Sequence, residues 1–216
     1  MSPKNLNASN KTHKFLLNQL KDKRIFQIYK KFEKDLKLNE NFIVAVSGGP
    51  DSLALCFLSK IYSIKKKLKV KYFHVDHKLR NNSAKEAKYV KLLIKKISAK
   101  LEILNWIGKK PKSNIQSVAR DKRYELLIKK AKKLKIKNIL LGHHKDDLIE
   151  NFFIRILRGS GLNGIVSFGE KTNQRKINLI RPLLKFFKKD LEYISKKVFK
   201  NYVEDPSNKN EEFKRV

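Results

Sequence analysis

The sequence has almost no cysteine and no long apolar run, which limits disulfides, cysteine-based metal centres and membrane spans. It has one cysteine, one tryptophan and one methionine among 216 residues. The single Cys56 excludes an internal disulfide and a cysteine-based zinc or iron–sulfur site within one chain. No apolar run approaches the roughly 20 residues that a membrane-spanning helix needs, and residues 1–14 lack the apolar segment of a secretion signal. We therefore expect a cytoplasmic protein with no membrane partner.

Acidic side chains are also scarce beside basic ones. Only 20 Asp and Glu stand against 52 Lys and Arg, which gives a formal net charge of +32. A charge of this size favours a polyanionic partner such as nucleic acid and makes binding salt-dependent. The alternative is a general compositional bias towards lysine with no specific partner, and composition leaves both open. A hydrophobic content of 41% is that of a globular chain, and the length suits one ordinary domain.

Strand-like and helix-like segments alternate from residue 42 onward. The apolar runs predict strands over 42–46, 69–75, 101–104, 138–141 and 177–180. Helices are predicted over 51–64 and 188–199 and from about residues 83, 114 and 146, with a capping box at 83–86. This alternation is typical of an α/β fold with a doubly wound, mainly parallel sheet and helices on both faces. Because residues 12–38 show helical spacing, we divide the chain into an N-terminal helical extension, 1–40, and an α/β domain, 41–216.

A glycine-rich turn follows the first predicted strand, with the sequence SGGPDS from Ser47 to Ser52. Its glycines let the backbone approach an anion, and the helix that begins near Asp51 aims its N–H groups and positive dipole end at that anion. A carboxylate here would repel a bare phosphate, so we expect a divalent cation to bridge the two. The turn lacks the Walker spacing, and the Rossmann-like segment 159–164 follows a predicted helix instead of a strand. The turn therefore predicts a pyrophosphate-binding site.

Two further polar clusters follow later strands: HVDHKLR at residues 74–80 and GHHKDD at residues 142–147. Ligands gather at the carboxyl ends of strands in such sheets, so we expect these clusters and the glycine turn to share one cleft. Asp147, at a helix start, could hold a cation or an amine. The alternative is that Asp146 caps the helix and the histidines are ordinary loop residues. A zinc site is disfavoured, because no histidine pair has the helical spacing of zinc enzymes.

A basic segment, NIQSVARDKRY at residues 114–124, opens the helix predicted from about residue 114. It brings Arg120, Arg123 and Tyr124 close together. The segment is either a solvated amphipathic face or a cationic edge that touches nucleotide phosphates or an RNA backbone.

Together these motifs resemble the tRNA(Ile)-lysidine synthetases, members of the N-type ATP pyrophosphatase or PP-loop group with an adenine nucleotide alpha hydrolase-like fold. The resemblance covers about residues 42 to 216, and also includes RGSGLNG at 158–164, IRPLL at 180–184 and EDPSN at 204–208 with Arg215. SGGPDS alone marks the wider group, whereas HHxDD followed by RGSGxxG is far more specific. The resemblance implies that ATP adenylates the C2 oxygen of the wobble cytidine in a tRNA(Ile) precursor with a CAU anticodon. Free L-lysine then displaces AMP to give lysidine.

The resemblance also implies roles for individual residues. ATP would be bound by Ser47, Gly48, Gly49, Asp51, Ser52, His74 and Asp76, with Asp51 holding Mg²⁺. The catalytic residues would be Asp51, Arg120, His143 and Asp147. The RNA would be contacted by Arg80, Arg123, Arg158 and Arg181.

The sequence departs from the family pattern in two places. Asn151 replaces the threonine that usually follows the acidic residue at position 150, and family members usually continue past the region of Arg215 into further tRNA-contacting domains, which we expect to be absent here. A basic RNA-binding module without activity therefore stays open, as does another PP-loop enzyme such as a tRNA thiolase. Thiolation needs reactive cysteines, and Cys56 lies in an apolar stretch. The sequence does not fix the oligomeric state, and a homodimer stays open.

Overall fold

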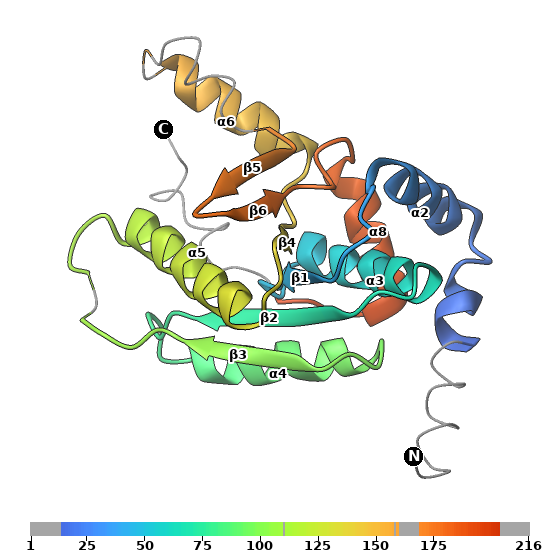
Figure 1. Cartoon of the computed structure of the whole chain (residues 1–216), viewed down its shortest axis with the longest axis horizontal. Helices are drawn as coiled ribbons and strands as arrows, with labels where there is room; N and C mark the ends of the chain where they lie inside the picture. The colour runs from blue at the N-terminus through green and yellow to red at the C-terminus, as the bar shows by residue number, and fades with distance from the viewer. Residues whose placement is uncertain (1–13, 110, 158, 160–168, 204–216) are drawn as a thin grey trace.

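A single six-stranded sheet organises the molecule, which we describe from a computed structural model over residues 14–109, 111–157, 159 and 169–203. The strand order is β3-β2-β1-β4-β6-β5 (Figure 1). The strands are β1 (Phe42–Ala45), β2 (Val70–Asp76), β3 (Leu101–Asn105), β4 (Asn138–Leu140), β5 (Lys171–Gln174) and β6 (Ile177–Ile180). All pairs are parallel except β5 with β6. The predicted mainly parallel sheet is confirmed.

Helices cover both faces of this sheet. They are α2 (Lys23–Asp35), α3 (Pro50–Lys65), α4 (Ser83–Lys95), α5 (Ile115–Lys133), α6 (Lys145–Leu157) and α8 (Lys188–Phe199). Successive strand side chains point to opposite faces, so β1 serves two cores. Phe42 and Val44 pack in the core that contains α2, α3, α4 and α8, whereas Ile43 packs in the core that contains α5. The doubly wound arrangement is confirmed.

The N-terminal helix α2 closes the first core. It begins after Asp22, whose side chain accepts hydrogen bonds from the backbone N–H groups of Arg24 and Ile25, the usual way to satisfy a helix start. Its apolar face buries Ile25 and Phe32 completely, and both belong to the same core as β1 and α3. The described part of the predicted helical extension therefore shares its core with the sheet.

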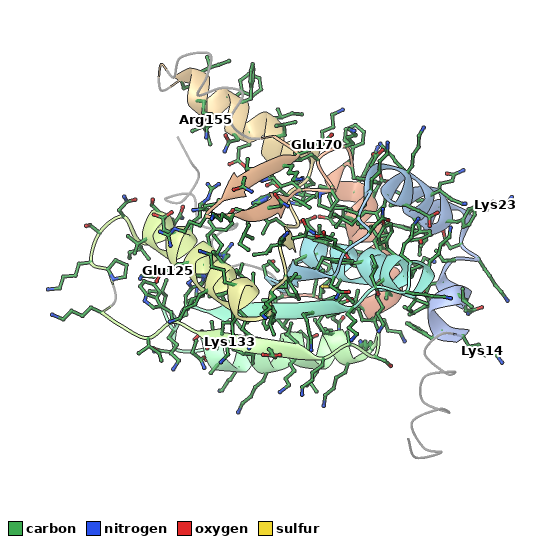
Figure 2. The ribbon with its side chains drawn as sticks, in the orientation of Figure 1. Lys14, Lys23, Glu125, Lys133, Arg155 and Glu170 are labelled. Atoms are coloured by element: carbon green, nitrogen blue, oxygen red, sulfur yellow. The ribbon has the colours of Figure 1, made fainter. Side chains whose placement is uncertain are left out.

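Helix α6 differs from its neighbours in its packing. It projects from the sheet at the upper left of Figure 1, and none of its residues is buried. No helix among the described residues is long and apolar enough to cross a membrane. Figure 2 shows nitrogen-tipped side chains projecting around the outline of the molecule, as the large excess of lysine requires.

Candidate active site

The turn after β1 is a preformed loop closed by its own hydroxyl groups. Ser52 Oγ accepts a hydrogen bond from the N–H of Gly48 (3.0 Å) and donates one to the carbonyl of Gly49 (3.0 Å). Ser47 Oγ donates to Ser52 Oγ (3.0 Å). Helix α3 follows directly, with Gly49 as N-cap and no side-chain cap on its first turn. Its first N–H groups therefore point to an anion site at the helix start.

The second part of the site lies where the strand order reverses, between β1 and β4. Beyond β4, a Cβ at Gly142 would lie 3.2 Å from both the Cα and the N atom of Ser52. The glycine therefore lets the segment after β4 press against the start of α3. This is the switch point at which ligands bind in open α/β sheets, and it brings the GHHKDD cluster beside the SGGPDS turn.

Two carboxylates from different helices meet at His144. The Nε2 atom of this buried ring lies 3.6 Å from Asp51 Oδ2 on α3 and 3.6 Å from Asp147 Oδ2 on α6. Asp147 Oδ2 also accepts a hydrogen bond from the backbone N–H of His144 (2.8 Å). Asp146 is half exposed and lies 4.0 Å from Nδ1 of the same ring. The geometry makes Asp51, His144 and Asp147 one cluster.

The charges of this cluster depend on one another. Burial favours the neutral imidazole, but the Asp51 hydrogen bond and the nearby carboxylates outweigh it and raise the pKa of His144. Burial raises the pKa of Asp147, and the negative charges of Asp51 and Glu150 add to this, against a lowering by His144. A cationic ligand would relieve the repulsion between the two carboxylates. The cluster is therefore suited to bind a cation or an amine.

His143, directly before His144, lies in a positively charged environment. Burial lowers the pKa of His143 to about 3, and the charges of Arg181, Arg120 and Arg123 add to this. The imidazole is therefore neutral at physiological pH. The arginines come from α5 and from the segment after β6, so the structure brings the basic helix start predicted from the sequence to the loop after β4.

Arg181, predicted as an RNA contact, lies inside the fold. It is only 5% exposed, and its Nη1 atom donates hydrogen bonds to the carbonyl of Gly169 (3.0 Å) and to Thr172 Oγ1 (3.2 Å). Burial lowers the pKa of Arg181, while a hydrogen bond with Tyr124 raises it. A side chain this buried offers little surface to an RNA backbone, and its charge acts on His143 instead.

The end of β2 forms the remaining part of the site. His74 Nδ1 lies 2.8 Å from the carbonyl oxygen of Val46, beside the glycine turn. Burial lowers the pKa of His74. Asp76 is buried, and its Oδ1 atom accepts a hydrogen bond from the N–H of Lys78 (2.9 Å).

The residues present fit a magnesium ion better than a zinc ion. Asp51 Oδ1 is buried and has no hydrogen-bond partner among the described residues, so it has a lone pair to offer a cation. Asp51, His144 and Asp147 are neighbours, but no three His, Cys, Asp or Glu side chains among those residues are arranged to hold a metal ion by themselves. Mg²⁺ needs only one or two carboxylates when phosphates and water complete its shell.

The structure places most of the predicted site residues at one edge of the sheet. Those brought there are Ser47, Gly48, Gly49, Asp51, Ser52, His74, Asp76, Arg120, Arg123, His143, Asp147 and Arg181. Arg80 is exposed between β2 and α4. Arg158, residues 160–164 of the RGSGLNG motif, and EDPSN with Arg215 lie outside the described residues.

His144 was not among the site residues predicted from the sequence. The family resemblance pointed to His143 of the histidine pair, and nothing in the pair itself says which ring faces the acidic groups. The available signal was the position of His144 directly before the α6 start, three residues from Asp147, where its backbone meets that carboxylate.

A parallel sheet whose first strand runs into a glycine turn at a helix start, with an acidic cluster beside it, defines an α/β domain built to hold a phosphorylated ligand. The chain belongs to the PP-loop domain family, whose model matches residues 18–216.

The chain is similar to proteins named tRNA(Ile)-lysidine synthase. It is 40% identical to that of Orientia tsutsugamushi over 179 residues, covering 82% of this chain and 40% of the relative. Identity is also 40% with the Wolbachia pipientis protein, covering 82% and 42%, and 36% with the Bradyrhizobium diazoefficiens protein, covering 84% and 51%. The chain thus spans about half or less of these relatives' lengths.

Among solved structures, the chain is similar to the U34-tRNA thiolase NcsA from Methanococcus maripaludis, with a TM-score of 0.73 at 18% identity. The match covers 86% of this chain and 68% of that one. At this identity the likeness shows the fold alone.

Proposed function

We propose that this chain catalyses ATP-dependent formation of lysidine on a tRNA(Ile) precursor with a CAU anticodon. In the first step the C2 oxygen of the wobble cytidine attacks the α-phosphorus of ATP, and the bond to pyrophosphate breaks. In the second step the side-chain ammonium of free L-lysine gives up a proton to water, the resulting amine attacks C2, and the C–O bond to AMP breaks while the new nitrogen substituent releases a further proton to water. Adenylation makes a poor leaving group into a good one. The proposed tRNA substrate agrees with a cytoplasmic location.

The meeting of Asp51 and Asp147 at His144 is the observation that carries this proposal. The reaction needs a polyphosphate and a cationic amino acid in one cleft, and these two carboxylates supply a binding group for each. Asp51 stands at the start of α3, beside the anion-binding turn. The relatives named tRNA(Ile)-lysidine synthase support the same choice of substrates.

The remaining residues take roles that follow from their surroundings. The backbone N–H groups of Gly48 and Gly49 and the start of α3 would hold the phosphates. Bound Mg²⁺ would neutralise phosphate charge, and Asp51 would hold it. Arg120 would stabilise the charge that develops at the α-phosphorus.

His143 and Asp147 would serve the amine half of the site. His143 is neutral at physiological pH because its pKa is lowered to about 3 by burial and by the neighbouring arginines, so it adds no positive charge against an incoming ammonium. Asp147 would hold that ammonium. Arg80 and Arg123, both exposed, would contact the RNA backbone, as would Arg158.

The proposal is tested by incubating the 216-residue chain with a tRNA(Ile) transcript, ATP, Mg²⁺ and labelled lysine. We expect label in the RNA only when ATP is present. Asp147→Ala should lower lysine transfer by about 100-fold, the size expected for losing a charge-assisted contact of about 3 kcal/mol. Asp146→Asn, which changes an exposed carboxylate one residue away, is the matched control and should retain activity. An Asp147→Ala chain with unchanged transfer would remove the assignment.

The same assay separates the proposal from its rivals. Retention of RNA without incorporation of lysine would indicate a binding module. A tRNA thiolase is not favoured, because Cys56 is completely buried in α3 and burial raises the pKa of its thiol well above the usual range. Such a thiol is not a nucleophile at neutral pH.

A further inference from the structure

His144 joins three separate parts of the fold at the site. Its backbone forms an isolated parallel bridge with Leu183, in the segment that leads to α8. Its N–H donates to Asp147 on α6, and its ring reaches Asp51 on α3. The main chain of His144 is therefore held in place by Leu183 and Asp147, and its side chain lies beside the carboxylates of Asp51 and Asp147. Neither the family match nor the named relatives assign it a role.

Only one edge of the ring makes this contact. Nε2 lies 3.6 Å from an oxygen of each carboxylate, so those two oxygens are no farther apart than twice that distance. Nδ1 is buried, has no hydrogen-bond partner among the described residues and lies 4.0 Å from Asp146 Oδ2. The nearest acidic groups to the ring are therefore Asp51 and Asp147.

Two carboxylates that approach within this limit repel each other. An N–H that lies at the same distance from an oxygen of each carboxylate offsets that repulsion and favours the rotamers of both side chains that keep the contact. Partners of this kind fix the orientation of the groups that bind a ligand.

We infer that His144 is a positioning residue that holds Asp51 and Asp147 in a shared geometry, so that the nucleotide-binding and lysine-binding halves of the site form together. Asp51 faces the phosphates and Asp147 faces the amine, as proposed above. The ring contacts neither substrate and acts only through the two carboxylates.

A purely local role would explain part of this geometry. His144 directly precedes α6, and the bond from its N–H to Asp147 is the backbone half of a capping box, which stabilises a helix start. That role needs only the main chain of residue 144. It does not explain why an imidazole is buried at this position with Nε2 beside Asp51.

This inference rests on the proposed function, and two amide variants of the full chain test it. In His144→Gln the side-chain amide nitrogen can reach the position of Nε2, whereas in His144→Asn it stops near the position of Nδ1. Both keep the backbone N–H that caps α6. Asp146→Asn is the control for a change of charge beside the ring. The measurements are Mg²⁺-dependent ATP binding by calorimetry, kcat and KM for lysine, and the thermal midpoint.

We expect His144→Asn to weaken Mg²⁺-dependent ATP binding and to raise KM for lysine, each by about 10- to 100-fold, as for other residues that orient a binding group. His144→Gln should recover most of both losses. A merely structural role would instead lower kcat in proportion to the folded fraction, at unchanged KM. Equal behaviour of the two amide variants, or a change in only one of the two substrates, overturns the inference.

The failure of the proposed function gives a different pattern. If the wild-type chain transfers no lysine, that function is wrong, and the ATP titrations still test the position of Asp51 by comparing the Gln and Asn variants. If the wild-type chain shows no Mg²⁺-dependent ATP binding, both the inference and the proposed function are wrong.

Discussion

Gly48 has no room for a side chain. Its φ of +99° lies in the region that L-residues rarely adopt, and a Cβ there would come 2.5 Å from Val90 Cγ2 on α4. Its carbonyl also accepts a hydrogen bond from the N–H of Val203 (3.0 Å). The absence of a side chain at Gly48 thus lets the turn after β1 pack closely between α4 and the segment after α8. This close packing is the physical reason for a glycine at this position of the motif.

We expect Gly48→Ala to lower the free energy of unfolding by about 1 to 3 kcal/mol, the usual effect of overpacking a dense site, and to abolish ATP binding. Gly49→Ala is the matched control for stability, because φ is −72° at this position and a Cβ there would have only Ser47 Oγ nearby, at 3.7 Å. Thermal unfolding of the two variants checks this. Equal loss of stability in both would show that the contact with Val90 is not limiting.

His77 is a second residue whose surroundings give a measurable effect. Its ring packs edge-on against Trp106, with centroids 6.0 Å apart, and neither ring nitrogen has a hydrogen-bond partner among the described residues. Burial lowers the pKa of His77 to about 4, and the positive charges of Arg123 and His74 add to this, against a raising by Asp76. The folded protein therefore holds this imidazole neutral.

The usual pKa of histidine is about 6.5. As pH falls from this value towards 4, His77 binds a proton in the unfolded chain but stays neutral in the folded protein. The free energy of unfolding therefore falls with acidification over this window. We expect His77→Phe to lose less stability than wild type between neutral pH and pH 4, measured as thermal midpoints. Parallel profiles would contradict the assignment. The raised pKa values of Asp147 and His144 act in the opposite sense but are common to both proteins.

At the scale of elements, the sequence predicted what is strongly patterned. The predicted strands correspond to β1, β2, β3, β4 and β6, and every predicted helix is present near its expected start. The predicted capping box at 83–86 is wrong, since α4 begins at Ser83 itself, with Asn82 as N-cap and no side-chain cap bond. The helix itself was predicted correctly, because the apolar spacing of Ala87, Val90 and Ile94 indicates a helix, and these three residues are buried in α4.

Strand β5 was missed for two physical reasons. Its residues, KTNQ, carry no apolar alternation, because it is an edge strand with no buried residue. The two-residue turn that joins it to β6 also lacks the usual asparagine and glycine. Arg175 and Lys176 occupy it with φ of 52° and 67°, the left-handed pair of a type I′ hairpin turn.

The strain at these two turn residues can be reduced by substitution, and this should stabilise the β5–β6 hairpin. We expect Arg175→Asn together with Lys176→Gly to raise the free energy of unfolding by about 1 kcal/mol, because these residues adopt positive φ with less strain. For a chain of this size that corresponds to about 2 to 4 °C in thermal midpoint. The exchange Arg175→Lys with Lys176→Arg is the control, since it keeps two side chains that carry the same strain. If the control also gained stability, backbone strain at the turn would not be the cause of the stabilisation.

At the scale of the whole molecule, the topology rule for parallel sheets predicted that the polar clusters lie together. The contacts of His144 bring the GHHKDD cluster to the SGGPDS turn, and His74 of the third cluster lies beside the strand that leads into that turn. Sequence could not say which histidine of the pair would meet Asp51, because that depends on how α3 and the loop after β4 face each other. It also gave no sign of the contact between His77 and Trp106, which requires the pairing of β2 with β3. Such facts arise from packing between distant segments and leave no local pattern.

The large positive charge is the remaining feature at this scale, and its two interpretations give different salt dependence. If the chain binds tRNA through several phosphate contacts, affinity should fall by about 1,000-fold or more between 50 and 200 mM salt. Arg123 lies in the middle of α5, where its charge acts on His143 and His77, whereas Lys133 is the last residue of the same helix (Figure 2). The two positions therefore allow a matched comparison.

We expect Arg123→Gln to reduce the slope of log affinity against log salt by about 1, as for the loss of one phosphate contact. Lys133→Gln should leave the slope unchanged. Filter binding of a tRNA(Ile) transcript over a salt series measures both. Equal changes in the two variants would mean that tRNA meets the charge of the whole surface rather than the edge formed by the start of α5, and the excess lysine would then be a general compositional bias.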